Sequence, residues 1–129
     1  KATKEDIAAI EQHFTNGVYW VLCPESNRFI SRTEPPVETL RNAGVKIAIG
    51  TDSLASARHL SMVENMRLLG DIPLDELLIW ATRNGAEALG LEASLGDIRV
   101  GTTPGIVVIE DADLQNMRVT DQTLSRRII

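Results

Sequence analysis

The feature that most constrains the fold is a pair of short apolar runs separated by a helical pattern. Residues 18–23 form a nearly continuous apolar run, and residues 45–50 form a second run rich in β-branched side chains. Between them, Pro35 and Pro36 can begin a helix that Gly44 would end. Two strands joined through a helix form a βαβ unit with parallel strands. The sequence therefore predicts an α/β fold, with strands covered on both faces.

Amphipathic helices are predicted on both sides of this unit. Residues 3–14 place Ile7, Ile10 and Phe14 on one apolar stripe, and Thr3 is a suitable N-cap. After the second apolar run, one helix is predicted over residues 59–69. Its inner face would carry Leu60, Val63, Met66 and Leu69.

A third helical pattern begins at Pro73, with Leu74, Leu77, Leu78 and Ala81 facing inward. Asn84-Gly85 is expected to break or bend this helix before a short helical segment that ends at Gly90. Residues 25–34, by contrast, are predicted to form a polar loop.

The character of the sequence changes after Gly90. Glycines punctuate short β-like segments there, of which residues 106–109 form the clearest strand. We therefore predict two regions, residues 1–90 and 91–129. Because two parallel strands alone do not make a stable covered sheet, we expect the chain to be the last part of a larger α/β protein.

Composition limits the classes of partner. The formal charge is −5, which gives no general attraction to nucleic acid or anionic membranes. No apolar run approaches the roughly 18 residues of a membrane span. Cys23 is the single cysteine, which fits a reducing compartment. We expect a cytoplasmic protein that binds a small molecule, with no nucleic-acid or membrane partner.

Asp52 is the main candidate for chemistry. It follows the second apolar run in the sequence Gly50-Thr51-Asp52-Ser53, where a strand would deliver a carboxylate into a loop. Ligands of α/β proteins bind at the carboxyl ends of parallel strands. An N-cap or turn role is the alternative, because Asp favours both positions.

Several segments in order resemble the metal-dependent amidohydrolase superfamily, especially its deaminase and chlorohydrolase branch. Gly-Thr-Asp alone is common, so the resemblance rests on the ordered set and its spacing. The segments are Cys23-Pro24-Glu25-Ser26-Asn27, Gly50-Thr51-Asp52-Ser53, Leu60 to Met66, Ala81 to Leu91 and the glycine-punctuated run from Leu95 to Gly105.

The resemblance implies a (β/α)8 TIM barrel with a composite β-sandwich. Residues 1–90 would be the C-terminal portion of the barrel, with the two apolar runs as barrel strands seven and eight. Residues 91–129 would be part of the small sandwich subdomain. The chain would be the last third of such an enzyme, beginning just after barrel strand six.

The resemblance also implies a metal-dependent chemistry. Asp52 would be a ligand of a divalent metal, zinc or iron, and the catalytic proton carrier. The family's other ligands are histidines that match nothing in this chain. His13 is read as a solvated helix residue and His59 as a capping or surface residue. A catalytic zinc needs three protein ligands, so the isolated chain is expected to be inactive and metal-free.

Three residues of the matching motifs, besides Asp52, are candidates for the substrate side of the pocket. Ser26 and Asn27 match the strand-seven loop of the family, and Ser53 follows Asp52 directly. The alternative is turn chemistry for Ser26 and Asn27, and loop ordering for Ser53. Cys23 is read as a small buried strand residue.

The resulting prediction is the C-terminal third of a hydrolase acting on a C–N or C–Cl bond of a cyclic substrate, such as a nucleobase-like amine. A non-catalytic scaffold that packs or self-associates through its exposed strand edges is the alternative. A small nucleotide-binding α/β module is disfavoured, because no Gly-rich loop joins a strand to a helix.

Overall fold

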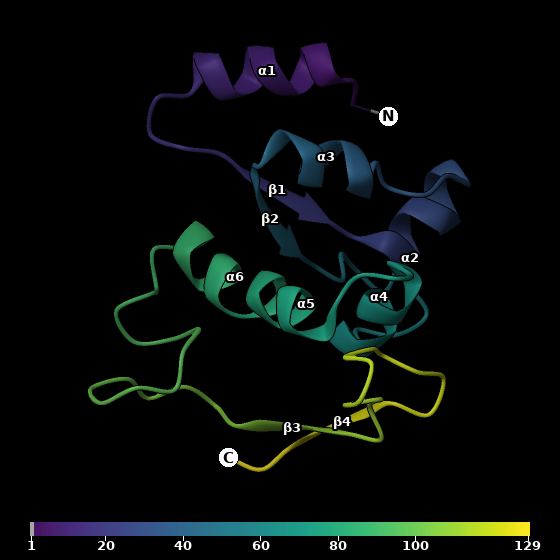
Figure 1. Cartoon of the computed structure of the whole chain (residues 1–129), viewed down its shortest axis with the longest axis vertical. Helices are drawn as coiled ribbons and strands as arrows, with labels where there is room; N and C mark the ends of the chain where they lie inside the picture. Colours follow the sequence, from purple (N-terminus) through teal and green to yellow (C-terminus); the bar gives the residue numbers. More distant parts are fainter. Residues whose placement is uncertain (1) are drawn as a thin grey trace.

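The computed structural model describes residues 2–129 of the chain as an α/β structure (Figure 1). The elements in order are α1 (Lys4–His13), β1 (Tyr19–Leu22), α2 (Pro24–Ser26), the π-helical segment η1 (Asn27–Ser31), α3 (Val37–Ala43), β2 (Lys46–Ile49), α4 (Met62–Leu68), α5 (Leu74–Ala81), α6 (Arg83–Ala88), β3 (Val107–Glu110) and β4 (Leu124–Arg127).

The predicted βαβ unit is confirmed. Strands β1 and β2 pair in parallel, with Tyr19 opposite Lys46 and Leu22 opposite Ile49, and α3 lies between them in the chain. Strands β3 and β4 form a separate antiparallel pair. Within residues 2–129 each sheet has two strands, so the described part of the chain does not itself close a barrel.

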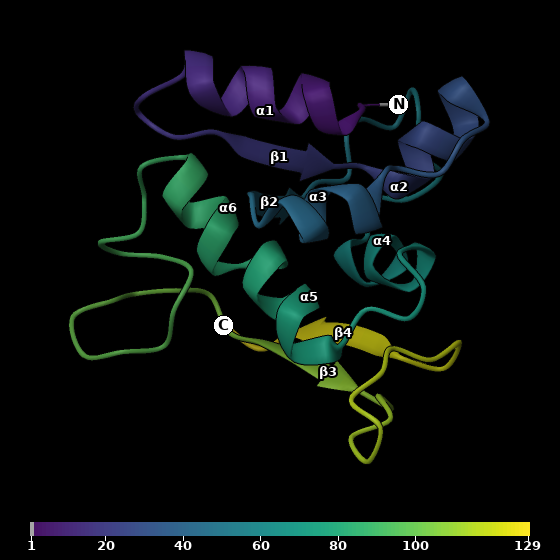
Figure 2. The ribbon, with the colours of Figure 1, turned by 45° about the horizontal axis from the view of Figure 1, so that its top comes forward.

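Helices pack against the parallel sheet in layers. Helix α1 packs on α3, while α5 and α6 pack against β2, and Figures 1 and 2 show the β3–β4 ribbon beyond α5. This arrangement buries one continuous apolar core. The core contains Ile7, Leu22, Leu40, Ile47, Ile49, Met66, Leu69, Ile72, Leu77 and Trp80.

Local sequence signals account for the first helix. The Thr3 hydroxyl accepts a hydrogen bond from the Asp6 backbone N–H, and the Asp6 carboxylate accepts one from the Thr3 N–H, which completes a capping box. Ile7 is buried as predicted. Phe14 is not part of the buried stripe, because the helix ends at His13 and leaves Phe14 exposed as the C-cap.

The break between α5 and α6 lies at Thr82, two residues before the Asn84-Gly85 position that the sequence indicates. Thr82 has a non-helical backbone, and its hydroxyl donates to the Leu78 carbonyl at 2.7 Å. Asn84 and Gly85 instead lie within α6. The Asn84 amide donates to the Ile47 carbonyl of β2 at 2.6 Å, which holds α6 against the strand.

Three other predictions are wrong. The loop predicted over residues 25–34 is largely helical, because Pro24 at the first helical position starts α2 and η1 continues it. The helix predicted over residues 59–69 begins only at Met62, after the N-cap Ser61, and this leaves Leu60 exposed. β1 is not covered along both faces in residues 2–129, since Val21 is 57% exposed.

The region after residue 90 is tied to the helical layer by polar contacts. Arg67 of α4 donates to the carbonyls of Thr120 and Thr123, at 2.9 and 2.8 Å. The Leu74 N–H at the start of α5 donates to the Met117 carbonyl. These contacts dock the β3–β4 region onto α4 and α5. None of the helices among the described residues is long and apolar enough to cross a membrane.

Candidate active site

The carboxyl ends of β1 and β2 lie side by side, and each leads into a polar segment. The Gly50 N–H donates to the Leu22 carbonyl at 2.8 Å, which carries the parallel pairing one step past the strand ends. A side chain at Gly50 would meet Val21 and the Cys23 sulfur at 3.1 Å. A residue without a Cβ therefore lets the two chain segments approach closely where the site begins.

Asp52 leaves β2 with a backbone conformation that most residues avoid. Its φ angle is 58°, in the left-handed region, where Asp and Asn are tolerated better than other side chains. This turn places the exposed Asp52 carboxylate beside the segment that follows β1.

Two hydroxyl groups hold this carboxylate. Ser26 Oγ donates to Asp52 Oδ2 at 2.7 Å, and Ser56 Oγ donates to the same oxygen at 2.8 Å. The hydrogen bond from Ser26, and then that from Ser56, hold the pKa of the Asp52 carboxyl below its ordinary value, because both favour the ionised form. The site thus contains an ionised carboxylate whose Oδ1 lies outside these two bonds.

The two serines reach Asp52 from different elements. Ser26 ends the short helix α2 and is only 5% exposed, so its hydroxyl is committed to the carboxylate. Ser56 is buried in the turn after β2, where its N–H donates to the Ser53 carbonyl. Asp52 is therefore not a simple N-cap, since its carboxylate accepts hydrogen bonds from hydroxyl groups of the segments that follow β1 and β2.

The remaining predicted residues lie around this cluster with different roles. Ser53 Oγ accepts a hydrogen bond from the Ala55 N–H, so its side chain orders the loop and does not touch Asp52. Asn27 is half-buried at the start of η1. Burial, and then the negative charge of Asp52, raise the pKa of the Cys23 thiol, which keeps it protonated.

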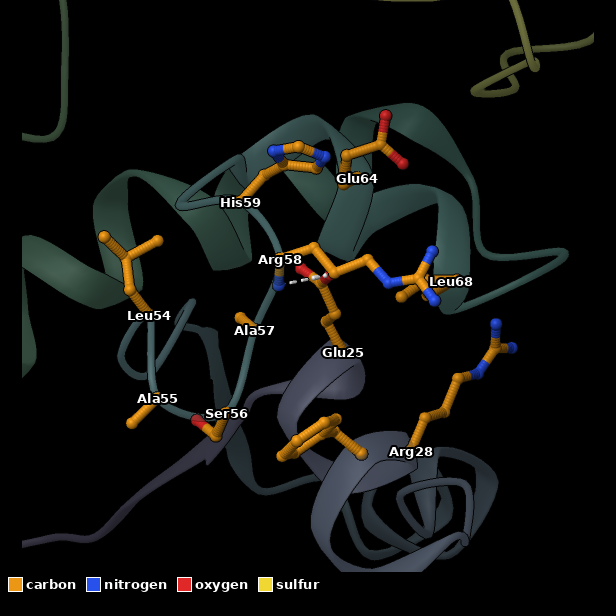
Figure 3. Close-up of a pocket in the computed structure, with 11 residues that line it drawn as sticks. Glu25, Arg28, Leu54, Ala55, Ser56, Ala57, Arg58, His59, Glu64 and Leu68 are labelled. Carbon is orange, nitrogen blue, oxygen red and sulfur yellow. Dashed lines mark hydrogen bonds between the residues drawn. The ribbon is translucent and has the colours of Figure 1, made fainter.

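A cleft of about 890 Å³ opens beside the Asp52 cluster (Figure 3). Ser56 links the two, since it lines the cleft and bonds Asp52. The other lining residues are Glu25, Arg28, Phe29, Leu54, Ala55, Ala57, Arg58, His59, Glu64 and Leu68. Its size is within the range of small-molecule sites in proteins.

Sequence reasoning missed Ser56, Glu25 and Asn65 as parts of this site. Ser56 lies 4 residues after Asp52 in the chain. Apart from this spacing and its hydroxyl group, the local sequence does not indicate that it bonds Asp52. The role of Asn65 depends on a contact with Glu25, 40 residues away, that no local pattern contains. His59 is exposed and lines the cleft, and His13 is exposed on α1.

Comparison with known proteins identifies the family of this chain. The amidohydrolase family matches the sequence over residues 2–126. The chain belongs to the amidohydrolase family. The sequence is 34% identical over 119 residues to a 5-methylthioadenosine/S-adenosylhomocysteine deaminase of Moorella thermoacetica, and 32% identical over 128 residues to one of Teredinibacter turnerae. These alignments cover 84% and 89% of the chain.

Solved structures of deaminases share the fold of this chain. An adenosine deaminase of Xanthomonas campestris with bound zinc superposes with a TM-score of 0.72 at 30% identity, over 90% of this chain and 28% of that one. Helicobacter pylori aminofutalosine deaminase gives a TM-score of 0.68 at 32% identity, over 81% of this chain and 27% of that one. The chain spans 27% and 28% of the lengths of the Moorella and Teredinibacter deaminases, so it corresponds to one portion of each of them.

The residues of this amidohydrolase chain fit one part of a metal centre. No group of three or more His, Cys, Asp or Glu side chains within residues 2–129 could hold a metal ion. A catalytic zinc requires about three protein ligands and an open position. Asp52 can supply one carboxylate ligand, but the described residues do not form a complete metal site.

Proposed function

We propose that the amidohydrolase containing this chain hydrolyses an exocyclic C–N bond of a purine-like substrate, and that Asp52 is its catalytic carboxylate. The relatives and solved structures above are named deaminases of 5-methylthioadenosine, S-adenosylhomocysteine, adenosine or aminofutalosine. The observation that carries the proposal is the Asp52 carboxylate at the end of β2, held ionised by two hydroxyl groups beside a cleft.

In this proposal Asp52 has two tasks. Its Oδ2 is oriented by Ser26 and Ser56, which leaves Oδ1 to bind a divalent metal, zinc or iron. When bound, such a metal lowers the pKa of a water molecule so that a nucleophile forms at neutral pH. Because Asp52 is ionised, its carboxylate can accept the proton of the attacking water and return it to the leaving amine.

The substrate side is assigned to the segments beside Asp52. Asn27 has its side chain at the start of η1, next to the cleft residue Arg28. The Ser26 hydroxyl already bonds Asp52, and the Ser53 hydroxyl already bonds the Ala55 N–H. These two serines would therefore shape this side of the pocket by fixing the carboxylate and its loop. We therefore propose Asn27 as the residue of the three that contacts substrate.

The test is the D52N variant of the intact protein, loaded with zinc or iron. Ammonia release from 5-methylthioadenosine, S-adenosylhomocysteine and adenosine is measured beside the wild type. We expect kcat to fall by at least the roughly 10²–10⁴-fold of a lost general acid–base. D75N is the matched control, because Asp75 is exposed on α5, and it should keep wild-type activity. Full activity of D52N would refute the role of Asp52.

The second candidate is a non-catalytic scaffold, favoured by the exposed Val21 on β1 and the two-stranded sheet. Exposed strand edges can pair with another polypeptide, including a second copy of this chain. This candidate predicts a wild-type protein that releases no ammonia from any of the three substrates with either metal and self-associates in analytical ultracentrifugation. Turnover of any of the substrates would exclude it.

A further inference from the structure

A buried asparagine joins the two segments that hold Asp52. Asn65 of α4 is 0% exposed, and both ends of its side-chain amide are paired. Oδ1 accepts a hydrogen bond from the Glu25 N–H at 3.1 Å, and Nδ2 donates to the Ser61 carbonyl at 3.0 Å. A buried amide is costly unless it is paired in this way, so Asn65 fixes the start of α2 to the start of α4.

Glu25 extends this connection to the loop that carries Asp52. Its Oε1 accepts a hydrogen bond from the Arg58 N–H at 2.8 Å, which Figure 3 shows as the dashed line. The next residue, Ser26, donates to Asp52. Helix α2 therefore holds the loop after β2 at Asp52 and Arg58, and Asn65 links the same helix to Ser61 at the loop's end.

We infer that Glu25 and Asn65 are positioning residues for the Asp52 carboxylate. They act by fixing α2 against the loop of residues 51–61, so that Ser26 and Ser56 both reach Oδ2. This inference rests on the proposed catalytic role of Asp52. Residues that orient a metal ligand commonly affect metal retention and turnover without touching the substrate.

Within the described part of the chain, only one carboxylate oxygen of Glu25 accepts a hydrogen bond, so glutamine is a conservative replacement that tests the inference. Oε2 is buried and has no hydrogen-bond partner within residues 2–129, so only Oε1 is used in the contact. A glutamine keeps the acceptor that receives the Arg58 N–H. Glu25→Gln should therefore preserve the positioning, whereas Glu25→Ala removes it.

The experiment compares E25A, E25Q and N65A in the intact zinc- or iron-loaded protein. We expect E25A to lower kcat and the metal retained after dialysis against a chelator by about 10–100-fold, with KM little changed. E25Q should behave as the wild type, and N65A should change in the direction of E25A. E38A is the matched control, because Glu38 lies on α3 and bonds Arg41.

Hydrogen exchange of the Arg58 amide provides a readout independent of activity. It should be faster in E25A and unchanged in E25Q. Should E25A not fold, E25Q and N65A carry the comparison. Two outcomes would overturn the inference even if D52N lost its turnover. One is wild-type kcat and metal retention in E25A or in a folded N65A. The other is an equal loss of both in E25Q and E25A. Full activity of D52N would instead refute the proposed function, and this inference with it.

Discussion

Replacing Gly96 with alanine should strongly destabilise the protein. Gly96 has a φ angle of +84°, and a Cβ added there would lie 2.6 Å from the Ala86 Cβ and 3.1 Å from the Arg83 Cα. The left-handed conformation costs a residue with a Cβ about 1–2 kcal/mol. Forcing an extra methyl group into a packed contact adds about 1–3 kcal/mol, so the total loss is about 2–5 kcal/mol.

Gly101 provides the matched control. Its φ angle is +93°, but a Cβ there would meet nothing within 4 Å. G101A should therefore show only the backbone cost of about 1–2 kcal/mol. Because both variants change glycine to alanine, their effects on the unfolded chain cancel in the comparison.

Urea unfolding followed by tryptophan fluorescence measures both variants. Trp80 is buried on α5, which packs against α6, so its emission reports on the layer that Gly96 contacts. The free energy of unfolding should fall about 1–3 kcal/mol further in G96A than in G101A. Equal losses in the two variants would refute the close packing of residue 96 on α6.

Two further predictions concern the helices. L77A should lower the free energy of unfolding by about 2–5 kcal/mol, because Leu77 is 0% exposed. Urea titration should show a much smaller effect for I79A, whose side chain is 42% exposed on the same helix. Equal effects would contradict the assigned inner face of α5. Hydrogen bonds from the Thr3 N–H and hydroxyl hold the pKa of the Asp6 carboxyl below its ordinary value. The capping contribution is thus fully present above that value and is lost as pH falls through the lower pKa of the folded state. The protection of the α1 amides, taken relative to the intrinsic exchange rate at each pH, should then fall at low pH in the wild type and depend less on pH in T3A. An unchanged pH dependence of this protection in T3A would contradict the capping box.

Local patterns predicted much of the fold. The βαβ unit, the parallel pairing of β1 with β2, the capped helix α1 and the strand β3 all follow from residues that are neighbours in the chain. Helix and strand periodicity, caps and glycine stops are short-range properties, so the sequence expresses them directly. The same reasoning placed Asp52 at a strand end.

Element boundaries were predicted less well where tertiary contacts compete with local preference. Asn84 looks like a helix breaker, yet it lies inside α6 because its amide pairs with the Ile47 carbonyl of β2. The segment after Pro24 looks like a loop because it is polar, yet α2 and η1 are helical there. In α2, the contact between the Glu25 N–H and Asn65 stabilises that conformation.

The sequence by itself determined that Asp52 follows a strand, and it carried the resemblance on which the proposed role of Asp52 rests. Only the tertiary structure decided what surrounds it. Ser26 lies 26 residues from Asp52 in the chain, and Asn65 lies 40 from Glu25, so these contacts depend on how β1, β2 and α4 pack. The physical reason is that a hydrogen bond requires two groups within about 3 Å. Packing alone brings such distant residues together.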